Sequence, residues 1–195
     1  MMYKSHAPTL GLCIDWETSG SSWGEDSTIK YQGIAFGAII FNTRTFEPVA
    51  ELYREIQFDD TKYEWSYEAE KIHGLSKEHL ALGVSRITAC CDLVEFLIKH
   101  LGPSPTVMVL AYNAGFDVGF TSQLLNEFDI EFKTHHVLLD VANTTFICFG
   151  TYKADHVFEL FGFDKRGAHN ALQDARMCLG VAKAYNSIFK ELFAS

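Results

Sequence analysis

Three acidic segments of this chain lie far apart in the sequence and strongly limit how it can fold. They are residues 14–18 (IDWET), 113–117 (NAGFD) and 169–174 (HNALQD). Side chains from distant segments form one site when a rigid scaffold brings them to the same place. Carboxylates gathered in this way would repel one another, and bound cations remove that cost. The three segments therefore predict a fold that assembles a site for divalent metal ions.

Asp15 and Glu17 lie two residues apart in the first segment, where the apolar residues of 10–14 predict a strand. Side chains two apart in a strand project to the same face, so both carboxylates can share a cation. Trp16 between them would face the opposite side, into packing or the wall of a cleft. An isolated pair of this kind is common among solvated loop acids, so its meaning depends on the other two segments.

Asp117 belongs to the second segment, which follows a short apolar run at 107–110 that predicts a buried strand. It falls in the first turn of a predicted helix over 116–128, where an acid can simply pair with the helix dipole. Strand ends that lead into helices are also where ligand sites lie in α/β sheets. Asn113 would cap this helix or orient a neighbouring carboxylate, and we favour such a supporting role.

Asp174 and His169 lie at the start of the last predicted helix, which begins near Asn170. Asp174 is beside the apolar stripe of Leu172 and Ala175, where an inward-facing acid needs a metal ion or a basic partner. His169 precedes the helix, and the usual pKa of histidine suits removal of a proton from water. A single histidine is more often structural, and its acidic neighbours are what favour a catalytic role here.

Strands come first in this sequence, and helices and strands alternate after them. The patterns predict a loop over 19–30, a turn over 42–48, and strands at 9–14, 31–41, 49–58, 107–110 and 137–139. They predict helices or helical turns at 67–72, 77–80, 87–100, 116–128, 141–149 and from about 170 onward. This order indicates an α/β fold in which a mixed sheet carries helices on its faces. A chain of 195 residues is expected to form a single domain, 1–195.

The composition is that of an ordinary globular protein, with 48% hydrophobic and 21% charged residues. The N-terminal residues lack the apolar run of a secretory signal, and no apolar stretch approaches the ~20 residues of a membrane span. Five cysteines without a C-x-x-C pair suit a reducing compartment, so we predict a cytoplasmic protein with no membrane partner. A zinc site of Cys90, Cys91 and His100 is the weaker alternative to buried free thiols on a helix.

The formal net charge of -9 at pH 7 argues against a protein that holds long duplex nucleic acid by phosphate neutralisation alone. It does not exclude a nuclease, because bound cations would reverse the local field at the acidic segments. Hard oxygen ligands without cysteine or paired histidine favour Mg²⁺ or Mn²⁺ over zinc.

The motifs become specific when they are read in order. D-x-E at 15–17, N-A-x-F-D at 113–117 and H-x-A-L-x-D-A at 169–175 resemble those of the DEDDh (DnaQ-like) family of 3'-to-5' exonucleases. Residues 68–75 also resemble the family's segment ending in V-H-G-I, and 32–39 resemble its second strand. The resemblance covers nearly the whole chain. It implies an RNase H-like fold, in which a mixed five-stranded sheet, an antiparallel meander plus parallel strands, is flanked by helices.

The resemblance also implies roles by position. Asp15, Glu17, Asp117 and Asp174 would hold two Mg²⁺ or Mn²⁺ ions, and His169 would be the general base. One ion would orient and acidify the water that attacks the terminal phosphorus, and the other would stabilise the departing 3' oxygen. Tyr112 departs from the family pattern, since many relatives have histidine before the asparagine; this departure bears on substrate preference rather than on activity.

Six residues are predicted to contact the substrate: Thr18, Trp16, His73, Asn113, Phe116 and Arg166. Arg166 is equally a phosphate contact or a solvated loop cation. Trp16, Trp23, Phe116 and Phe120 could stack on or wedge between terminal bases. Phe116 and Phe120 are four apart on a helix, and core packing fits them at least as well. Three other acids lack a matching motif and are expected to be structural or solvated: Asp140, Asp155 and Asp164.

The sequence thus predicts a 3'-to-5' exonuclease that acts on single-stranded ends of DNA or RNA and releases nucleoside 5'-monophosphates. The alternatives are a catalytically quiet subunit that binds nucleic acid or a polymerase, and an RNase H-type endonuclease. Expected partners are single-stranded 3' ends, with a polymerase or a second copy of the chain as further candidates. Proofreading in DNA replication, DNA repair, RNA trimming and nucleotide recycling are open alternatives for the pathway.

Overall fold

The computed structural model describes residues 8–22, 26–164 and 167–193. The strands are β1 (Leu10–Thr18), β2 (Gly33–Asn42), β3 (Pro48–Glu55), β4 (Val109–Ala111) and β5 (Leu139–Asp140). The helices are α1 (Asp26–Lys30), α2 (Tyr67–His73), α3 (Lys77–Leu80), α4 (Arg86–Leu101), α5 (Ala114–Asn126), α6 (Val141–Phe149), α7 (Ala154–Leu160) and α8 (Ala171–Phe193). Serine side chains cap three of the helix starts, as Ser85 does when it accepts from the Thr88 N–H at 3.2 Å.

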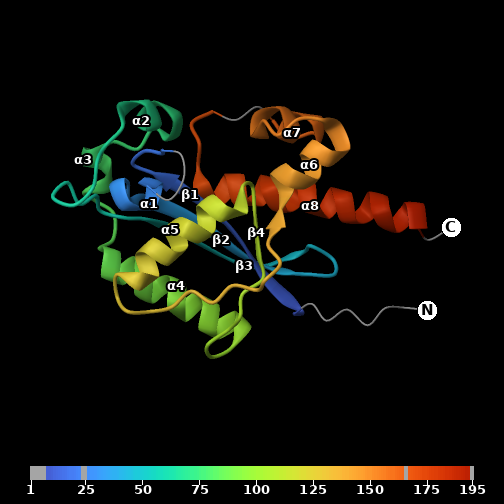
Figure 1. Cartoon of the computed structure of the whole chain (residues 1–195), viewed down its shortest axis with the longest axis horizontal. Helices are drawn as coiled ribbons and strands as arrows, with labels where there is room; N and C mark the ends of the chain where they lie inside the picture. The colour runs from blue at the N-terminus through green and yellow to red at the C-terminus, as the bar shows by residue number, and fades with distance from the viewer. Residues whose placement is uncertain (1–7, 23–25, 165–166, 194–195) are drawn as a thin grey trace.

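The five strands form one mixed sheet in the order β3-β2-β1-β4-β5. β1 pairs antiparallel with β2, and β2 antiparallel with β3, so the first three strands form a meander. β4 pairs parallel with both β1 and β5. The first strand and the last helix lie side by side at the centre of the molecule, blue against red (Figure 1). This architecture confirms the predicted α/β fold with a mixed five-stranded sheet flanked by helices.

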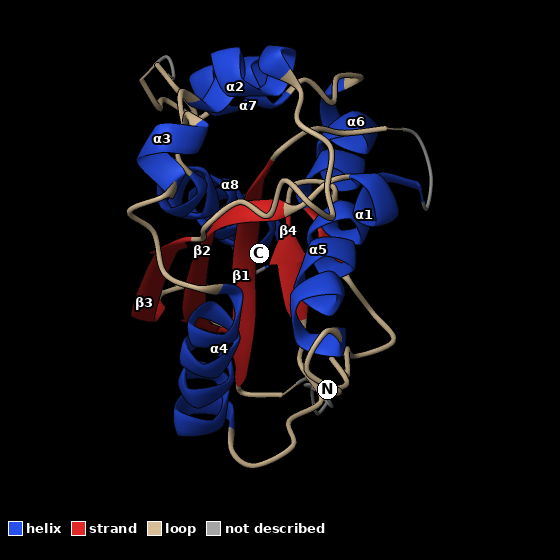
Figure 2. Ribbon diagram, turned by 90° about the vertical axis from the view of Figure 1, so that its left-hand side faces the viewer, coloured by secondary structure: helices blue, strands red, loops and turns tan. Residues whose placement is uncertain are grey.

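Each face of the sheet is covered by its own apolar core, because successive β1 side chains alternate between the faces. Leu12, Ile14 and Trp16 pack with α4 and α5, whereas Cys13 packs with α7 and α8. Figure 2 shows the helices on the two sides of the sheet. The alternation places Asp15 and Glu17 on the α8 face, the same side as Cys13.

Several predicted boundaries were wrong. β1 continues to Thr18, so Asp15 and Glu17 lie within the strand rather than beyond it. The predicted loop over 19–30 contains α1, which α5 holds through the Gln123 side chain, a donor to the Thr28 carbonyl at 2.6 Å. α7 was not predicted, because its seven residues are too few for a clear helical period. Tertiary contacts, rather than local pattern, form both short helices.

All five cysteines lie in the described part of the chain and are free thiols. Cys90 is buried on α4 as predicted, but its neighbour Cys91 is exposed. Among the helices of the described ranges, none combines the length and the apolar character needed to cross a membrane.

Candidate active site

The first and third acidic segments meet where β1 passes the start of α8. One ligand atom each from Glu17, His169 and Asp174 lies within 4.8 Å of the other two. Nδ1 of His169 is 3.7 Å from Oδ2 of Asp174. Both acids are almost fully buried, with 7% of Glu17 and 4% of Asp174 exposed, while His169 is half-buried. Two buried carboxylates and a half-buried imidazole thus lie close together.

The second segment joins the first through Asp117. Its side chain is 2% exposed, and Oδ1 accepts a hydrogen bond from the backbone N–H of Trp16 at 3.1 Å. Burial raises the pKa of Asp117 well above its usual value, and the nearby charge of Asp15 raises it further. The four predicted carboxylates are therefore brought together at the central strand of the sheet, from β1, α5 and α8.

A glycine in β2 allows α8 to approach this closely. Gly37 pairs with Asp15 across the β1–β2 ladder. A Cβ atom at Gly37 would overlap the backbone N and Cα of Leu172 and lie 2.5 Å from the carbonyl carbon of Ala171. The first turn of α8 consequently rests directly on the sheet backbone, and Asp174 is placed over β1.

His169 is held by the segment around α2. Its backbone N–H donates to the Ile72 carbonyl at 3.0 Å. The neighbouring His73 is 4% exposed, and its Nδ1 accepts from the Leu75 N–H at 3.0 Å. Burial lowers the pKa of His73, and the nearby His169 lowers it further. The charge of Glu70 and a hydrogen bond to the Thr18 backbone act in the opposite direction and raise this pKa. His73 is therefore a buried neighbour of His169. This burial does not fit the prediction that the His73 ring contacts substrate.

Trp16 is also a core residue, as the packing alternative predicted, and it is not exposed for stacking on a base. Its ring is 4% exposed, lies 5.1 Å from the ring of Phe36, and donates from Nε1 to Thr121 Oγ1 at 2.9 Å. Phe116 is half-buried with its ring 4.8 Å from that of Phe120, so the core-packing alternative describes it better. Thr18 is buried and donates to the Gly20 carbonyl at 2.9 Å.

Asn113 occupies the cap position of α5 in a left-handed conformation, with φ of 72°, but its side chain makes no cap hydrogen bond. Asp140 performs that role instead: Oδ2 accepts from the Ala114 N–H at 3.0 Å, and Oδ1 accepts from the Asn143 N–H at 3.1 Å. One carboxylate caps both α5 and α6. The sequence analysis placed Asp140 among the structural or solvated acids, and only its position just before α6 could have indicated a cap.

Tyr112 connects β4 to the segment between α6 and α7. Its hydroxyl donates to the Tyr152 carbonyl at 2.8 Å, and its ring lies 5.6 Å from that of Phe158. The rival acids Asp155 and Asp164 are exposed. Arg166 and Trp23, both predicted to contact substrate, lie outside the described residues.

The donor set fits a hard divalent cation. Oδ2 of the buried Asp117 has no hydrogen-bond partner within the described ranges, although buried polar atoms are normally satisfied. The site offers carboxylate oxygens and one imidazole, and the cluster contains no thiolate. A cation here would satisfy Oδ2 and offset the repulsion that raises the Asp117 pKa.

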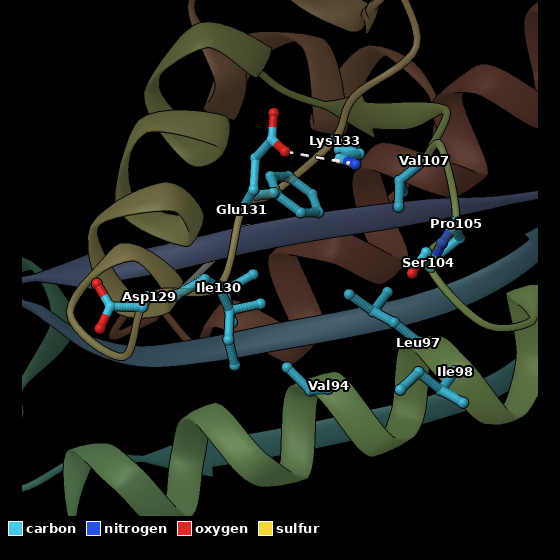
Figure 3. Close-up of a pocket in the computed structure, with 12 residues that line it drawn as sticks. Val94, Leu97, Ile98, Ser104, Pro105, Val107, Asp129, Ile130, Glu131 and Lys133 are labelled. Atoms are coloured by element: carbon cyan, nitrogen blue, oxygen red, sulfur yellow. Dashed lines mark ion pairs between the residues drawn. The ribbon is translucent and has the colours of Figure 1, made fainter.

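A groove of about 340 Å³ lies elsewhere, between α4 and residues 129–133 (Figure 3). Val94, Leu97 and Ile130 line its apolar part, and Glu131 and Lys133 form an ion pair at its edge. The groove contains none of the acidic site residues, so it is separate from the candidate active site.

Comparison with known proteins identifies the family. A family model described as RNase T, exonuclease, matches residues 12–182. The chain belongs to this exonuclease family. This membership confirms the predicted resemblance to DEDDh exonucleases and the prediction that the chain is a hydrolytic exonuclease. No curated protein matches the chain in sequence.

Solved structures of exonucleases share the fold. The nuclease domain of 3'hExo, a DEDDh family member bound to rAMP, has a TM-score of 0.70 at 13% identity, covering 92% of each chain. A 3'-exonuclease in a study of histone mRNA stem-loop recognition has a TM-score of 0.70 at 14% identity, over 92% of this chain and 82% of that one. Exonuclease I of E. coli with a dT13 oligonucleotide has a TM-score of 0.75 at 14% identity, over 96% of this chain and 43% of that one. The chain thus spans less than half of that enzyme.

Proposed function

We propose that this exonuclease hydrolyses the terminal phosphodiester bond at 3' ends of single-stranded DNA or RNA and releases nucleoside 5'-monophosphates. The observation that carries the proposal is the convergence of Glu17, His169 and Asp174 within 4.8 Å, with buried Asp117 joined to the same strand. Carboxylates held at the central strand of a rigid sheet, beside a half-buried imidazole, provide the groups that phosphodiester hydrolysis needs.

Asp15, Glu17, Asp117 and Asp174 would hold two Mg²⁺ or Mn²⁺ ions. When bound, such ions lower the pKa of water and neutralise the charge that develops on phosphate and leaving oxygen. They would also supply the attraction for phosphate that a chain with a net charge of -9 otherwise lacks. An acidic protein can in this way take a polyanionic substrate.

His169 is the proposed general base. Its ring is half-buried and faces Asp174 at 3.7 Å, so the acid favours the orientation in which the imidazole can accept a proton from water. The hydrogen bond from its backbone to Ile72 keeps it beside the acids. Trp16 contributes through its backbone N–H, which binds Oδ1 of Asp117, while Oδ2 has no hydrogen-bond partner among the described residues and is left for a metal ion.

Both a deoxyribonucleotide and a ribonucleotide ligand are bound in solved structures of this fold. The Exonuclease I structure contains a dT13 oligonucleotide, and the 3'hExo structure contains rAMP. We therefore propose single-stranded 3' ends as the substrate and keep both DNA and RNA within the proposal.

The test compares Asp174→Asn with Asp155→Asn, an exposed acid of α7 as the matched control. Single-stranded DNA and RNA carrying a 5' label are incubated with Mg²⁺ or Mn²⁺, and a parallel set has a blocked 3' end. We expect stepwise shortening and mononucleotide release by the wild type and the control. Asp174→Asn should lose at least about 10³-fold in rate, since removal of a charge-stabilising group commonly costs that much.

Equal rates for Asp174→Asn and the wild type would refute the proposal. Tight binding of single strands without turnover would instead identify the catalytically quiet subunit. Internal cuts in a substrate with a blocked 3' end would identify an endonuclease.

A further inference from the structure

The apolar stripe of α8 continues past the part of the helix that packs on the sheet. One side of the helix carries four apolar residues at spacings of four, three and four: Val181, Tyr185, Ile188 and Leu192. The first two are buried in the core, whereas Ile188 and Leu192 are exposed. Figure 1 shows the last turns of α8 extending beyond the other helices. The end of this helix thus presents an apolar surface to solvent.

Helix α6 exposes apolar side chains beside the same part of α8. Ile147 of α6 and Phe189 of α8 are both exposed and line one groove of about 460 Å³ between the two helices. Tyr185 also lines this groove, and its ring lies 6.3 Å from that of Phe149. We call this surface the α6–α8 patch, and its residues are Phe146, Ile147, Phe149, Ile188, Phe189 and Leu192.

The α6–α8 patch is larger than the apolar patches of ordinary monomers. Two exposed neighbours extend it, since Leu138 lines the same groove and the Tyr152 ring lies 6.3 Å from that of Phe146. Aromatic side chains offer about 150–250 Å² each and aliphatic ones somewhat less, so the exposed parts together come to roughly 800 Å². The largest patch of a monomer is typically about 300–600 Å², and a stable complex buries about 800 Å² on each partner. The exposed apolar area therefore matches one side of a stable protein interface.

The segment that forms much of this surface carries almost no charge. Asp140 is the one charged residue in the sequence 137–152. Its two carboxylate oxygens accept hydrogen bonds from the backbone N–H groups of Ala114 and Asn143. Nucleic acid is held by lysine and arginine, which this segment does not contain, so the surface suits a protein better. Two copies of a chain with a net charge of -9 repel one another, and an uncharged surface is where they can meet.

The patch contains both a hollow and a side chain that can fill one. The groove lies between α6 and α8, and Ile147, which lines it, is 83% exposed. A twofold dimer needs both features on one surface, because each copy presents the same patch to the other. The patch is also separate from the candidate active site, since Ile188 follows Asp174 by 14 residues, or about 20 Å along the axis of α8.

We propose that the α6–α8 patch is the interface of a twofold symmetric homodimer, in which Ile147 of each copy enters the groove of the other. The exposed end of α8 then packs against the second copy, and the candidate active sites at the other end of α8 stay open to substrate. The inference is independent of the proposed function, because association is measured without substrate or metal.

The test is sedimentation equilibrium of the full chain from about 0.1 to 100 µM, a range that covers micromolar dissociation constants. We expect the wild type to form dimers. Ile147→Glu should raise the dissociation constant at least about 100-fold, because each copy would bury an unpaired acid at the interface. Ile188→Glu should have the same effect from α8. Leu82→Glu is the matched control, since Leu82 is 87% exposed in the turn after α3 and should dimerise like the wild type.

A wild type that stays monomeric at every concentration would overturn the proposal. So would an unchanged dissociation constant in either Ile147→Glu or Ile188→Glu, or an equal loss of dimers in Leu82→Glu. Circular dichroism checks that each variant is folded, and where one patch variant fails to fold the other carries the comparison. If a monomeric wild type binds a labelled dT oligonucleotide in chelator and Ile147→Glu does not, the patch is a nucleic-acid surface and the proposed dimer is wrong.

Discussion

The backbone N–H of Trp16 donates to Oδ1 of Asp117 at 3.1 Å, and this hydrogen bond joins β1 to the first turn of α5. It satisfies one oxygen of a carboxylate that is almost completely buried. The other oxygen has no partner in the part of the chain that the structure describes. A buried acid held in this way is stabilised by a cation or by a proton, and costs free energy when it has neither.

Asp117→Asn should raise the melting temperature of the metal-free protein at pH 7. Burial and Asp15 raise the pKa of Asp117 above 3.8, so the folded state binds the extra proton more tightly than the unfolded state. Stability of the metal-free protein therefore falls as the pH rises from 3.8 through the raised pKa. Removing the charge avoids that loss, and about 2–4 °C is expected for each kcal/mol recovered.

Thermal unfolding in a chelator from pH 4 to pH 8 measures this effect. The two melting temperatures should converge toward pH 4. Asp155→Asn, an exposed acid, should not change the pH profile. A lower melting temperature of Asp117→Asn at pH 7 would show that the charged form is already satisfied without metal.

Divalent cations should stabilise the wild type but not Asp174→Asn. Binding to the folded state alone adds about 2.7 kcal/mol when the ion is at 100 times its Kd, or roughly 5–10 °C in melting temperature. Asp174 is buried within 4.8 Å of Glu17 and His169, so its neutral amide removes a central ligand. Differential scanning calorimetry with Mn²⁺ and with a chelator measures the shift. The control variant Asp155→Asn should show the same Mn²⁺-dependent rise in melting temperature as the wild type. An equal rise in Asp174→Asn would show that the ion binds at a site that does not include Asp174.

Gly37→Ala should separate α8 from the sheet. The added methyl would overlap the Leu172 backbone, and backbone atoms cannot move aside as a flexible side chain can. Overpacking of this kind typically costs about 1–3 kcal/mol. We expect a lower melting temperature together with weaker Mn²⁺ binding by calorimetric titration, because Asp174 moves with α8. Gly115→Ala is the stability control, since its new Cβ meets nothing within 4 Å; equal behaviour of the two variants would refute the close-approach explanation.

His73→Gln should reduce the loss of unfolding free energy that the wild type shows as the pH falls below 6.5. Burial lowers the pKa of His73 below 6.5, so the unfolded state takes up a proton first as the pH falls. Stability from the neutral ring is present above pH 6.5 and is lost as the pH falls through the lowered pKa. Urea unfolding between pH 7.5 and 5 measures the slope. His156→Gln, on the exposed face of α7, should keep the wild-type slope, and an identical slope in His73→Gln would contradict the prediction.

The parts of the fold that follow from local periodicity could be predicted from the sequence. The two-residue spacing of Asp15 and Glu17 correctly predicted one shared face, and the apolar runs predicted five strands along the chain. Exposure was harder to predict, because it depends on which helix packs over a residue. Trp16 and Phe116 were predicted to contact substrate because they are aromatic. In the structure α5 covers Trp16, and Phe120 packs against Phe116.

Contacts between distant segments were beyond the sequence analysis for the same reason. The residues around Asp140 do not indicate that it caps a helix starting 26 residues earlier. The residues around Gly37 likewise do not indicate that α8 packs against it. Both depend on the order of strands in the finished sheet. The single domain over 1–195 and the cytoplasmic location stay predictions.

The double cap made by Asp140 links the acidic site to the outer border of the sheet. β5 is only two residues long, and Asp140 ends it while holding the first amide of α5 and an amide in the first turn of α6. Asp117 lies one turn into α5, so the carboxylate that ends β5 also holds the start of the helix that carries Asp117. The position of one acid of the candidate site is in this way tied to the outermost strand of the sheet.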